Sequence, residues 1–314
     1  MNRIFVFPGQ GCQFIGMGKD IYSQFTPAKD IFNTVDDILK KPLSKIIFEG
    51  NEEELNKTEN TQVAIMTVCI ALLETLKAET GKSIDQLCSF VAGHSAAEYI
   101  ALYAAGSISL QDATNLLKCR GHFMQEACQK SQGAMAACIK VPLEYLQKII
   151  KDVSRDGVCK IANDNSSTQV VISGQKNLVE RVIMILKDLN YRAIPLKVSG
   201  AFHSDLMIEA QKMMSIEIEK TQFQKPLIPI IMNTAAKQLE DVIEIKNNLK
   251  QQIVSNVRWR ETINYAITQK LEITEIGPGK VLSNLALRDQ YPFNINNISD
   301  TESLKDYIQN LIKT

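Results

Sequence analysis

The sequence has no excess of charge of either sign. Its 314 residues include 35 lysines and arginines against 35 aspartates and glutamates, so the formal net charge at pH 7 is zero. A chain without a net field gives no sign of binding nucleic acid or an anionic membrane, although balanced totals can hide a local basic patch. We therefore expect any acidic partner to be met by a local group of basic residues.

Metal-binding and targeting patterns are also lacking. The seven cysteines form no C-x-x-C pair, and no histidine or cysteine cluster has the spacing of metal ligands. The N-terminal "NRIFVFPGQG" lacks the regions of a signal peptide. The longest apolar stretch, Val63 to Leu73, is far shorter than the roughly 20 residues that cross a bilayer. These absences predict reduced, buried thiols, no metal and a cytoplasmic location.

The first part of the chain predicts alternating strands and helices. "RIFVFP" and "SFVAG" are short apolar runs that end at proline or glycine, as buried strands do. Helical periodicity covers about 20–40 and 61–77, and "AAEYIALYAAG" predicts a helix closed by Gly106. Such alternation predicts an α/β fold with a parallel sheet and helices on both of its faces.

The middle of the chain has a different order of elements. Between residues 134 and 198 the pattern is strand, helix, strand, strand, helix, strand, which is the ferredoxin-like βαββαβ arrangement. Alternation resumes after it, without internal repeats or long linkers. We therefore predict an α/β hydrolase-like catalytic domain, 1–127 and 199–314, with an inserted ferredoxin-like small domain, 128–198.

Ser95, in "VAGHSAAEYI", lies between a predicted strand and a predicted helix. A strand-turn-helix of this kind can hold a serine hydroxyl clear of the backbone, and the usual pattern for it is G-x-S-x-G. Here the flanking residues are Gly93 and Ala97. A match to G-x-S-x-A is weak by itself, so Ser95 is either a nucleophile or a hydroxyl at a strand end.

A serine nucleophile needs a base, and the sequence has only three histidines. His94 adjoins Ser95, and His122 lies within a predicted helix. His203, in "VSGAFHSDLM", follows a predicted strand through a glycine turn, a loop position typical of catalytic groups. His203 is therefore the preferred base, against the alternative of a polar side chain at the surface.

An arginine lies on the apolar face of the helix predicted from Ser109. The stripe has spacings of three and four residues and comprises Leu110, Ala113, Leu117, Arg120, Met124 and Ala127. A buried guanidinium needs an anion. The alternatives are an internal aspartate or glutamate, a helix edge open to water, and the carboxylate of a substrate, which the planar fork of arginine grips with two hydrogen bonds.

Eight segments occur in an order and at separations typical of one family: "FPGQGCQ", "GHSAAEY", "CRGHFMQEA", "GAMAA", "QVVISG", "SGAFHSDLM", "SNVRW" and "EIGPGKVL". Together they resemble the malonyl-CoA:acyl-carrier-protein transacylases, over nearly the whole chain. The resemblance implies a nucleophile at Ser95, a base at His203, and an oxyanion hole from the backbone amides of Gln10 and Ala96. It also implies that the main-chain carbonyl of Arg258 orients the histidine.

The same resemblance implies where the acyl group lies. Arg120 pairs with a malonyl carboxylate, and Met124 and Gln62 contact the substrate. Phe202, beside the histidine, disfavours a substituent on the malonyl α-carbon.

Several positions depart from the family's usual residues. Ala96 and Ala97 stand where Leu-Gly is common, Cys12 replaces a serine, and Val63 and Asn256 replace prolines. None removes a chemical group from the implied mechanism, but the methyl group of Ala97 must fit beneath the turn of Ser95.

The implied activity is two-step transfer of a malonyl group from malonyl-CoA to acyl carrier protein, for fatty acid synthesis, with no cofactor. We expect a monomer, and a basic surface for the acidic carrier at Lys280 and Arg288. The alternatives are a serine thioesterase or hydrolase, an acyltransferase of polyketide synthesis, and a catalytically silent module that binds the carrier.

Overall fold

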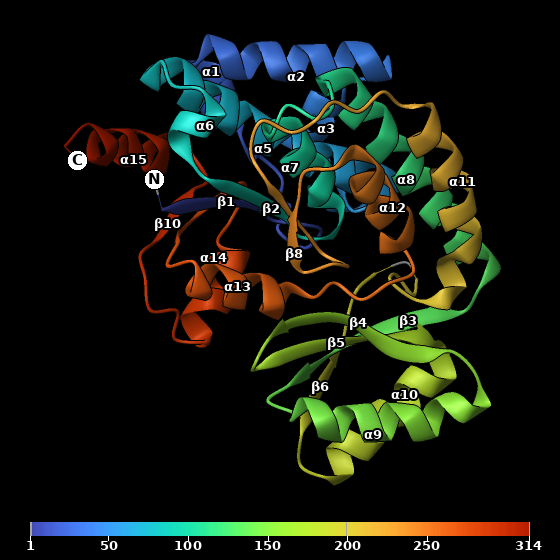
Figure 1. Ribbon diagram of the computed structural model, residues 1–314. Coiled ribbons are helices and arrows are strands. Elements are labelled where there is room, and N and C mark those ends of the chain that lie inside the picture. Colours follow the sequence, from blue (N-terminus) through green and yellow to red (C-terminus); the bar gives the residue numbers. More distant parts are fainter. Residues whose placement is uncertain (1, 199, 314) are drawn as a thin grey trace.

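The computed structural model describes residues 2–198 and 200–313, which are organised around two sheets (Figure 1). The strands are β1 Arg3–Phe7, β2 Phe90–Gly93, β3 Gly133–Ile139, β4 Cys159–Ser166, β5 Gln169–Gln175, β6 Arg192–Pro195, β7 Ile230–Met232, β8 Lys237–Leu239, β9 Glu272–Ile276 and β10 Ile295–Ile298.

The helices before the small sheet and within it are α1 Lys19–Gln24, α2 Thr26–Leu39, α3 Leu43–Glu49, α4 Glu52–Leu55, α5 Thr58–Thr80, α6 Ile84–Leu87, α7 Glu98–Ala104, α8 Leu110–Lys130, α9 Leu143–Val153 and α10 Lys176–Asp188. The later helices are α11 Ile208–Lys220, α12 Val242–Gln252, α13 Trp259–Thr268, α14 Val281–Arg288 and α15 Thr301–Lys313. Three short 3-10 turns are η1 Ser95–Ala97, η2 Ser154–Asp156 and η3 Asp205–Met207.

The large sheet has the strand order β10-β9-β1-β2-β7-β8. Every pair in it is parallel except β7 and β8, which form an antiparallel hairpin at one edge. Of the parallel strands, β1 and β2 are those predicted from "RIFVFP" and "SFVAG", and β7, β9 and β10 belong to the alternation expected to resume after the predicted small domain. The sequence did not predict β8, because three residues are too few to produce a periodic pattern.

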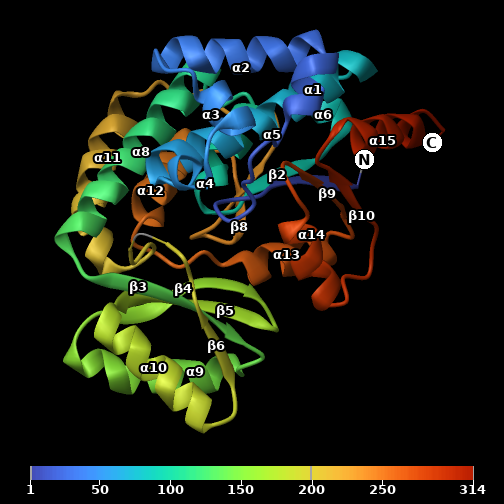
Figure 2. The same cartoon turned by 180° about the vertical axis from the view of Figure 1, so that it is seen from behind.

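Alternate side chains of β1 enter two separate cores. Phe5 and Phe7 pack in the core that contains α2, α5 and α8, whereas Ile4 and Val6 pack in the core formed with α13 and α14. Both faces of the sheet are therefore covered by helices, as Figure 2 shows from behind. The predicted α/β fold class is confirmed.

α5 is the central helix of the larger core. It is long and apolar enough to cross a membrane by length and composition alone, but 83% of its most apolar window is buried inside the fold. It packs against α2 and α8, and nearly every residue from Thr58 to Leu76 is buried. Its uninterrupted hydrophobicity is that of a helix surrounded by other elements.

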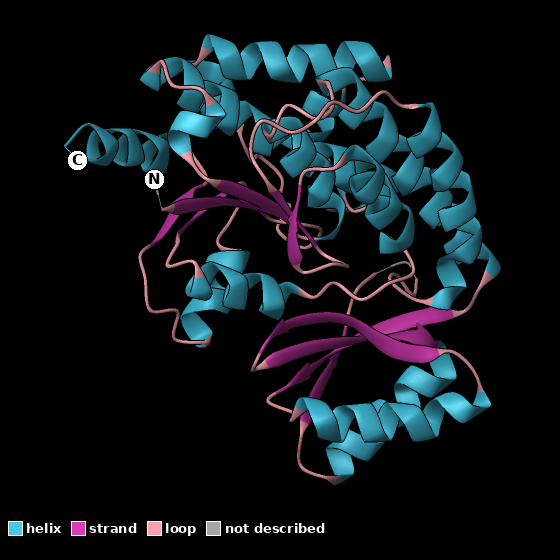
Figure 3. Cartoon of the chain, viewed as in Figure 1, coloured by secondary structure: helices cyan, strands magenta, loops and turns pink. Residues whose placement is uncertain are grey.

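The small sheet has the antiparallel order β4-β5-β3-β6, and α9 and α10 pack on one of its faces (Figure 3). This order of strands, with its βαββαβ connections, is that of the predicted ferredoxin-like unit. Along β3, Ala136 and Cys138 face these helices, whereas Met135 and Ala137 belong to the core shared with the large sheet. The open face of the small sheet is thus turned toward the rest of the molecule.

We propose that the small sheet and its two helices are a separate domain, as predicted. The boundary predicted after residue 127 falls inside α8, which continues to Lys130. The boundary predicted at Ser199 lies outside the described residues, as do the predicted domain ends Met1 and Thr314.

Polar contacts join the small sheet and the turn after β4 to α13 and to the residue that follows α14. Asp164 in β4 accepts hydrogen bonds from Arg260 in α13, at 2.6 Å from Nη2, and Ser167 donates to Asp289 at 2.6 Å. These contacts set the position of the small sheet over the carboxyl ends of β1 and β2, where the candidate site lies.

Candidate active site

Ser95 occupies a sharp turn between β2 and α7. Its φ of 55° is in the left-handed region, which non-glycine residues adopt at a cost. The turn brings the backbone of Ala97 so close to Gly93 that a Cβ at position 93 would lie 1.9 Å from the Ala97 carbonyl oxygen. Glycine is therefore required at position 93.

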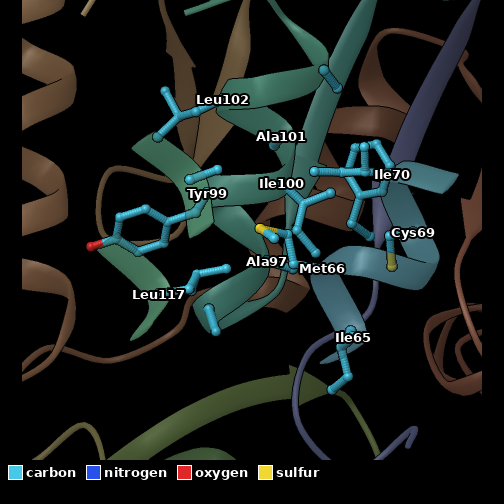
Figure 4. Close-up of a cluster of buried hydrophobic side chains, with 14 of the residues drawn as sticks. Ile65, Met66, Cys69, Ile70, Ala97, Tyr99, Ile100, Ala101, Leu102 and Leu117 are labelled. Atoms are coloured by element: carbon cyan, nitrogen blue, oxygen red, sulfur yellow. The ribbon is translucent and has the colours of Figure 1, made fainter. Parts of the chain in front are cut away.

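Ala97 is buried beneath this turn and has an ordinary right-handed backbone conformation. Figure 4 shows it in the same cluster of buried side chains as Met66, Ile100 and Leu117. The core has room for the methyl group, so the departure from G-x-S-x-G does not disturb the turn.

His203 lies against the serine. Its Nε2 is 2.7 Å from the Ser95 Oγ, and its Nδ1 is 2.9 Å from the carbonyl oxygen of Gln252 and 3.1 Å from that of Ser255. Since carbonyls only accept, Nδ1 carries the proton, and Nε2 of the neutral ring is free to accept from the hydroxyl. Burial, assisted by the charge of Arg120, lowers the pKa of His203 to about 3, so the ring is neutral at pH 7.

The prediction that the Arg258 carbonyl orients His203 is wrong. The two carbonyls that reach Nδ1 belong to Gln252, at the end of α12, and to Ser255, the first residue of the "SNVRW" segment that also contains Arg258. The Arg258 carbonyl instead begins α13 by accepting from the Thr262 amide at 3.2 Å. Main-chain acceptors do orient the histidine, but they lie three and six residues before Arg258 in the sequence.

The other two histidines are not placed to act on Ser95. The Nε2 of His94 is 2.8 Å from Oδ1 of Asn165 in the small sheet, and its ring packs against Trp259. His122 is on the solvent side of α8, 3.6 Å from Glu126.

Arg120 is only 1% exposed and has no carboxylate within ion-pair distance in the described part of the chain. Nη1 donates to Oε1 of Gln62 at 2.8 Å, and Nη2 donates to Oε1 of Gln252 at 2.9 Å and to the Ser95 Oγ at 3.2 Å. Burial lowers the pKa of Arg120, but a guanidinium keeps its charge. The direct partners of this cation are therefore neutral, and the alternative of a direct internal carboxylate partner is wrong.

The backbone amides of Gln10 and Ala96 lie beside Ser95 and line the same cavity. Within residues 2–198 and 200–313, neither amide donates a hydrogen bond to a protein acceptor. Two unpaired amides next to a serine hydroxyl can stabilise an oxyanion that develops on a carbonyl attacked there.

The cavity above Ser95 has a volume of about 350 Å³ and lies between the two sheets. Of the side chains predicted to contact substrate, those of Arg120, Met124 and Phe202 line it, whereas Gln62 lies behind and holds Arg120. The small sheet contributes amide and apolar side chains, namely Met135, Ala137, Asn163, Asn165, Gln169 and Val171. α14 contributes Val281, Leu282 and Leu285.

Lys280 and Arg288 are exposed at the two ends of α14, the helix that lines the cavity with its apolar side. The structure thus places the two cations at the margin of the site. Among the described residues, no group of three or more His, Cys, Asp or Glu side chains is arranged to hold a metal ion.

Three buried polar residues of the site gave no signal in the sequence. Gln252 and Asn233 both contact the backbone of Ser95: Nε2 of Gln252 donates to its carbonyl and Oδ1 of Asn233 accepts from its amide, each at 2.7 Å. Asn163 lines the cavity with an Oδ1 that has no partner in the described part of the protein. Single uncharged amides in a strand, a loop and a helix end form no recurring pattern, so they could not be found from the sequence.

The serine hydroxyl is hydrogen-bonded to a neutral imidazole and lies next to two unpaired amides. This arrangement defines the class of enzymes that form an acyl-serine. Comparison with known proteins agrees with this class, since residues 4–309 match the acyl transferase domain family. The chain is 41% identical to the malonyl CoA-acyl carrier protein transacylase of Bacillus subtilis, over 99% of this chain and 98% of the relative.

Two solved structures extend the comparison. An acyl-carrier-protein S-malonyltransferase from Bartonella henselae is 38% identical and superimposes with a TM-score of 0.95 over 99% of each chain. A malonyl-transacylase solved in complex with a type II polyketide-synthase acyl carrier protein is 35% identical, with a TM-score of 0.94 over 99% of this chain and 100% of that one. The chain belongs to the malonyl CoA-acyl carrier protein transacylase family.

The turn of Ser95 gives a first testable prediction. Gly93→Ala forces a Cβ into the Ala97 carbonyl, and we expect it to lower the free energy of unfolding by about 1–3 kcal/mol or more, as overpacking does. It should also abolish the reaction of Ser95 with a serine-directed phosphonylating reagent, measured by intact mass. The matched variant Ala97→Gly should cost only about 1 kcal/mol and keep the reaction. Equal behaviour of the two variants would contradict this account of the turn.

Proposed function

We propose that this protein transfers a malonyl group from malonyl-CoA to the pantetheine thiol of acyl carrier protein. The observation that carries the proposal is the buried Arg120, whose charge lacks a direct carboxylate partner and whose Nη2 is 3.2 Å from the Ser95 Oγ. A carboxylate on the acyl group gives this cation a partner and places the thioester carbonyl beside the serine.

The first half-reaction forms a malonyl-serine. Nε2 of His203 takes the proton of the Ser95 hydroxyl while Oγ bonds to the thioester carbonyl carbon. The carbonyl oxygen becomes an oxyanion that accepts from the amides of Gln10 and Ala96. The C–S bond then breaks, and the CoA sulfur leaves with the proton from His203.

The second half-reaction reverses these roles. The thiol of the carrier's pantetheine gives its proton to Nε2 of His203, and its sulfur attacks the ester carbonyl. The bond between that carbon and Oγ breaks, and Oγ recovers the proton. Each step uses side-chain and backbone groups of this chain only, so the proposed mechanism calls for no cofactor.

The polar lining of the small sheet supports binding of the pantetheine arm common to both substrates. The unpaired Oδ1 of Asn163 is buried in the cavity wall and needs a donor, which an amide N–H of the arm can provide. Met135 and Val171, on neighbouring strands, offer apolar surface to the rest of the arm. Phe202 and Met124 flank the acyl group, and Phe202 disfavours a branched α-carbon.

We place the enzyme in fatty acid synthesis, as a cytoplasmic monomer. The likeness to a transacylase in complex with a polyketide carrier makes service to polyketide synthesis the second candidate. The rate of transfer to a fatty-acid carrier compared with a polyketide carrier separates the two. A hydrolase would instead release malonate to water when no carrier is present.

The first half-reaction is tested by intact mass after mixing with malonyl-CoA. The mass should increase by one malonyl group, and Ser95→Ala should abolish the increase because it removes the nucleophile. His203→Ala should slow the labelling about 100- to 10,000-fold, the usual scale for a general base. Labelling that persists in Ser95→Ala would move the acyl group to another residue.

Arg120 distinguishes a malonyl transferase from a general serine hydrolase. Arg120→Ala should lower kcat/KM for malonyl-CoA by roughly 2 to 5 kcal/mol, as for loss of one partner of a desolvated charge pair. Acetyl-CoA has no carboxylate to lose, so its use should not fall. The ratio of the two rates is the measurement.

Lys118→Ala is the matched control, because Lys118 is an exposed cation of the same helix. It should leave the ratio of malonyl to acetyl transfer unchanged. A ratio that is also preserved in Arg120→Ala would show that Arg120 has a structural role and would favour the hydrolase.

Lys280 and Arg288 are the proposed contacts for the acidic carrier. Reversing both charges to glutamate should raise KM for the carrier and weaken its salt dependence, while acylation by malonyl-CoA alone continues at the original rate. Reversal of Lys29 in α2 and of Lys40 directly after it, both exposed, is the control and should change neither, because α2 packs on the face of the large sheet opposite to α14 (Figure 1). Equal damage to both half-reactions by the first pair would count against this surface.

A further inference from the structure

Glu98 is a buried carboxylate that the mechanism above does not use. It is the first residue of α7, three positions after Ser95, and is 1% exposed. Among the described residues it forms no ion pair with a lysine, arginine or histidine. An ionised carboxylate in such a place is costly unless donors satisfy both of its oxygens.

Two buried residues supply those donors. Oε1 of Glu98 accepts from the backbone amide of Asn233, and Oε2 accepts from Nε2 of Gln252. Both residues are completely buried. The carboxylate therefore joins α7 to the loop after β7 and to the end of α12.

Gln252 in turn contacts all three groups on which the proposed reaction depends. Its Oε1 accepts from Nη2 of Arg120 at 2.9 Å, and its Nε2 donates to the Ser95 carbonyl at 2.7 Å. Its main-chain carbonyl accepts from Nδ1 of His203 at 2.9 Å. Any rotation of this side chain therefore changes the surroundings of Arg120 and Ser95 together.

The charge of Glu98 determines how the Gln252 amide is oriented. A carboxylate only accepts, so it requires the NH2 group of Gln252 on its side and leaves Oε1 for Arg120. The reversed amide would place NH2 against the guanidinium and a carbonyl against both Glu98 and the Ser95 carbonyl. Asn233 extends the same support, because its side chain accepts from the Ser95 amide and donates to the Gly93 carbonyl, each at 2.7 Å.

We propose that the Glu98 carboxylate is a positioning residue for acyl transfer. Through Gln252 and Asn233 it holds Ser95, His203 and Arg120 in the arrangement that accepts a carboxylated acyl group. The inference rests on the proposed malonyl transfer and adds to it a residue that touches neither substrate nor the reacting atoms.

The ionisation of Glu98 gives this role a pH dependence. Burial raises the pKa of Glu98 to about 7, against the opposing effect of its hydrogen bonds and of Arg120. The other titratable groups near it are Tyr99 and His203. Burial raises the pKa of Tyr99 above the ordinary value of a tyrosine, and the pKa of His203 lies near 3. Both stay neutral from pH 6 to 8, and Arg120 stays charged, so of these four groups only Glu98 changes charge in that range.

The decisive variant is Glu98→Gln, which replaces one acceptor oxygen by an NH2 group. Because Asn233 and Gln252 both donate to this side chain, one of the two hydrogen bonds is lost or Gln252 must reverse. We expect malonyl-serine formation to slow about 10- to 100-fold, comparable to the loss of one preorganising hydrogen bond. Acetyl-serine formation should slow less, because only the malonyl group uses Arg120.

The pH profile provides a readout that a structural role would not move. In the wild type the acylation rate should rise between pH 6 and 8 with an apparent pKa near 7, and this rise should be absent in Glu98→Gln.

The matched control is Glu275→Gln: Glu275 is another fully buried glutamate, and it accepts from the backbone amides of Leu282 and Ser283. It should lower the melting temperature but keep the wild-type pH profile and the malonyl to acetyl ratio.

Gln252→Met alone keeps the proposal testable if Glu98→Gln folds poorly, because it should also remove the rise of the acylation rate between pH 6 and 8. Where both variants fold, a double-mutant cycle measures their coupling. If Glu98 acts mainly through Gln252, the double variant should be little slower than the slower single variant. Additive losses, an unchanged malonyl to acetyl ratio in Glu98→Gln, or an unchanged pH profile would overturn the positioning role. Failure of the wild type to form malonyl-serine would instead refute the proposed function.

Discussion

A guanidinium held in the core without a direct carboxylate partner is the constraint on which the rest of the site depends. Hydrogen bonds to the neutral side-chain oxygens of Gln62 in α5 and Gln252 in α12 stabilise Arg120 in that core. These two helices are far apart in the sequence. The amides of the two glutamines accept from Nη1 and Nη2, whereas Nε has no partner among the described residues, and the positive charge stays uncancelled. In the proposed reaction this charge binds the carboxylate of the acyl group, next to the serine hydroxyl.

The two side chains proposed to react are also held by backbone conformations that cost stability. Ser95 and His203 both have positive φ angles, 55° and 57°, which are unfavourable for residues with a side chain. Each is fixed by contacts from other elements: Asn233 and Gln252 hold the backbone of Ser95, and two carbonyls hold the ring of His203. The strained backbone thus lowers the stability of the fold, and in return the hydroxyl and the imidazole are already aligned before substrate binds.

Much of the architecture could be predicted from the sequence because apolar periodicity and element order are local properties. The strand at "RIFVFP", the alternation that follows it and the βαββαβ order of the middle segment all reflect burial. The position of Arg120 on an apolar stripe likewise predicted a buried cation. These predictions needed no knowledge of how distant segments approach one another.

The partners of those residues could not be predicted for the same reason. Gln252 and Glu98 are single polar residues whose importance appears only when α12 lies beside the turn of Ser95. The error over Arg258 has this origin: a carbonyl can orient His203 only if the chain path brings it there, and the path brings Gln252 and Ser255 instead. The resemblance indicated that a main-chain carbonyl orients His203, but not which residue provides that carbonyl.

The position of β1 in the large sheet has a consequence for synthesis of the chain. Of the described strands β1 is translated first, yet it pairs on one side with β2 and on the other with β9, at residues Glu272–Ile276. One edge of this apolar strand therefore stays unpaired until more than four-fifths of the 314 residues have been translated. Unpaired strand edges template aggregation. Until β9 is translated, protection of the β1 edge by other factors therefore matters more for the nascent chain than the stability of the finished fold.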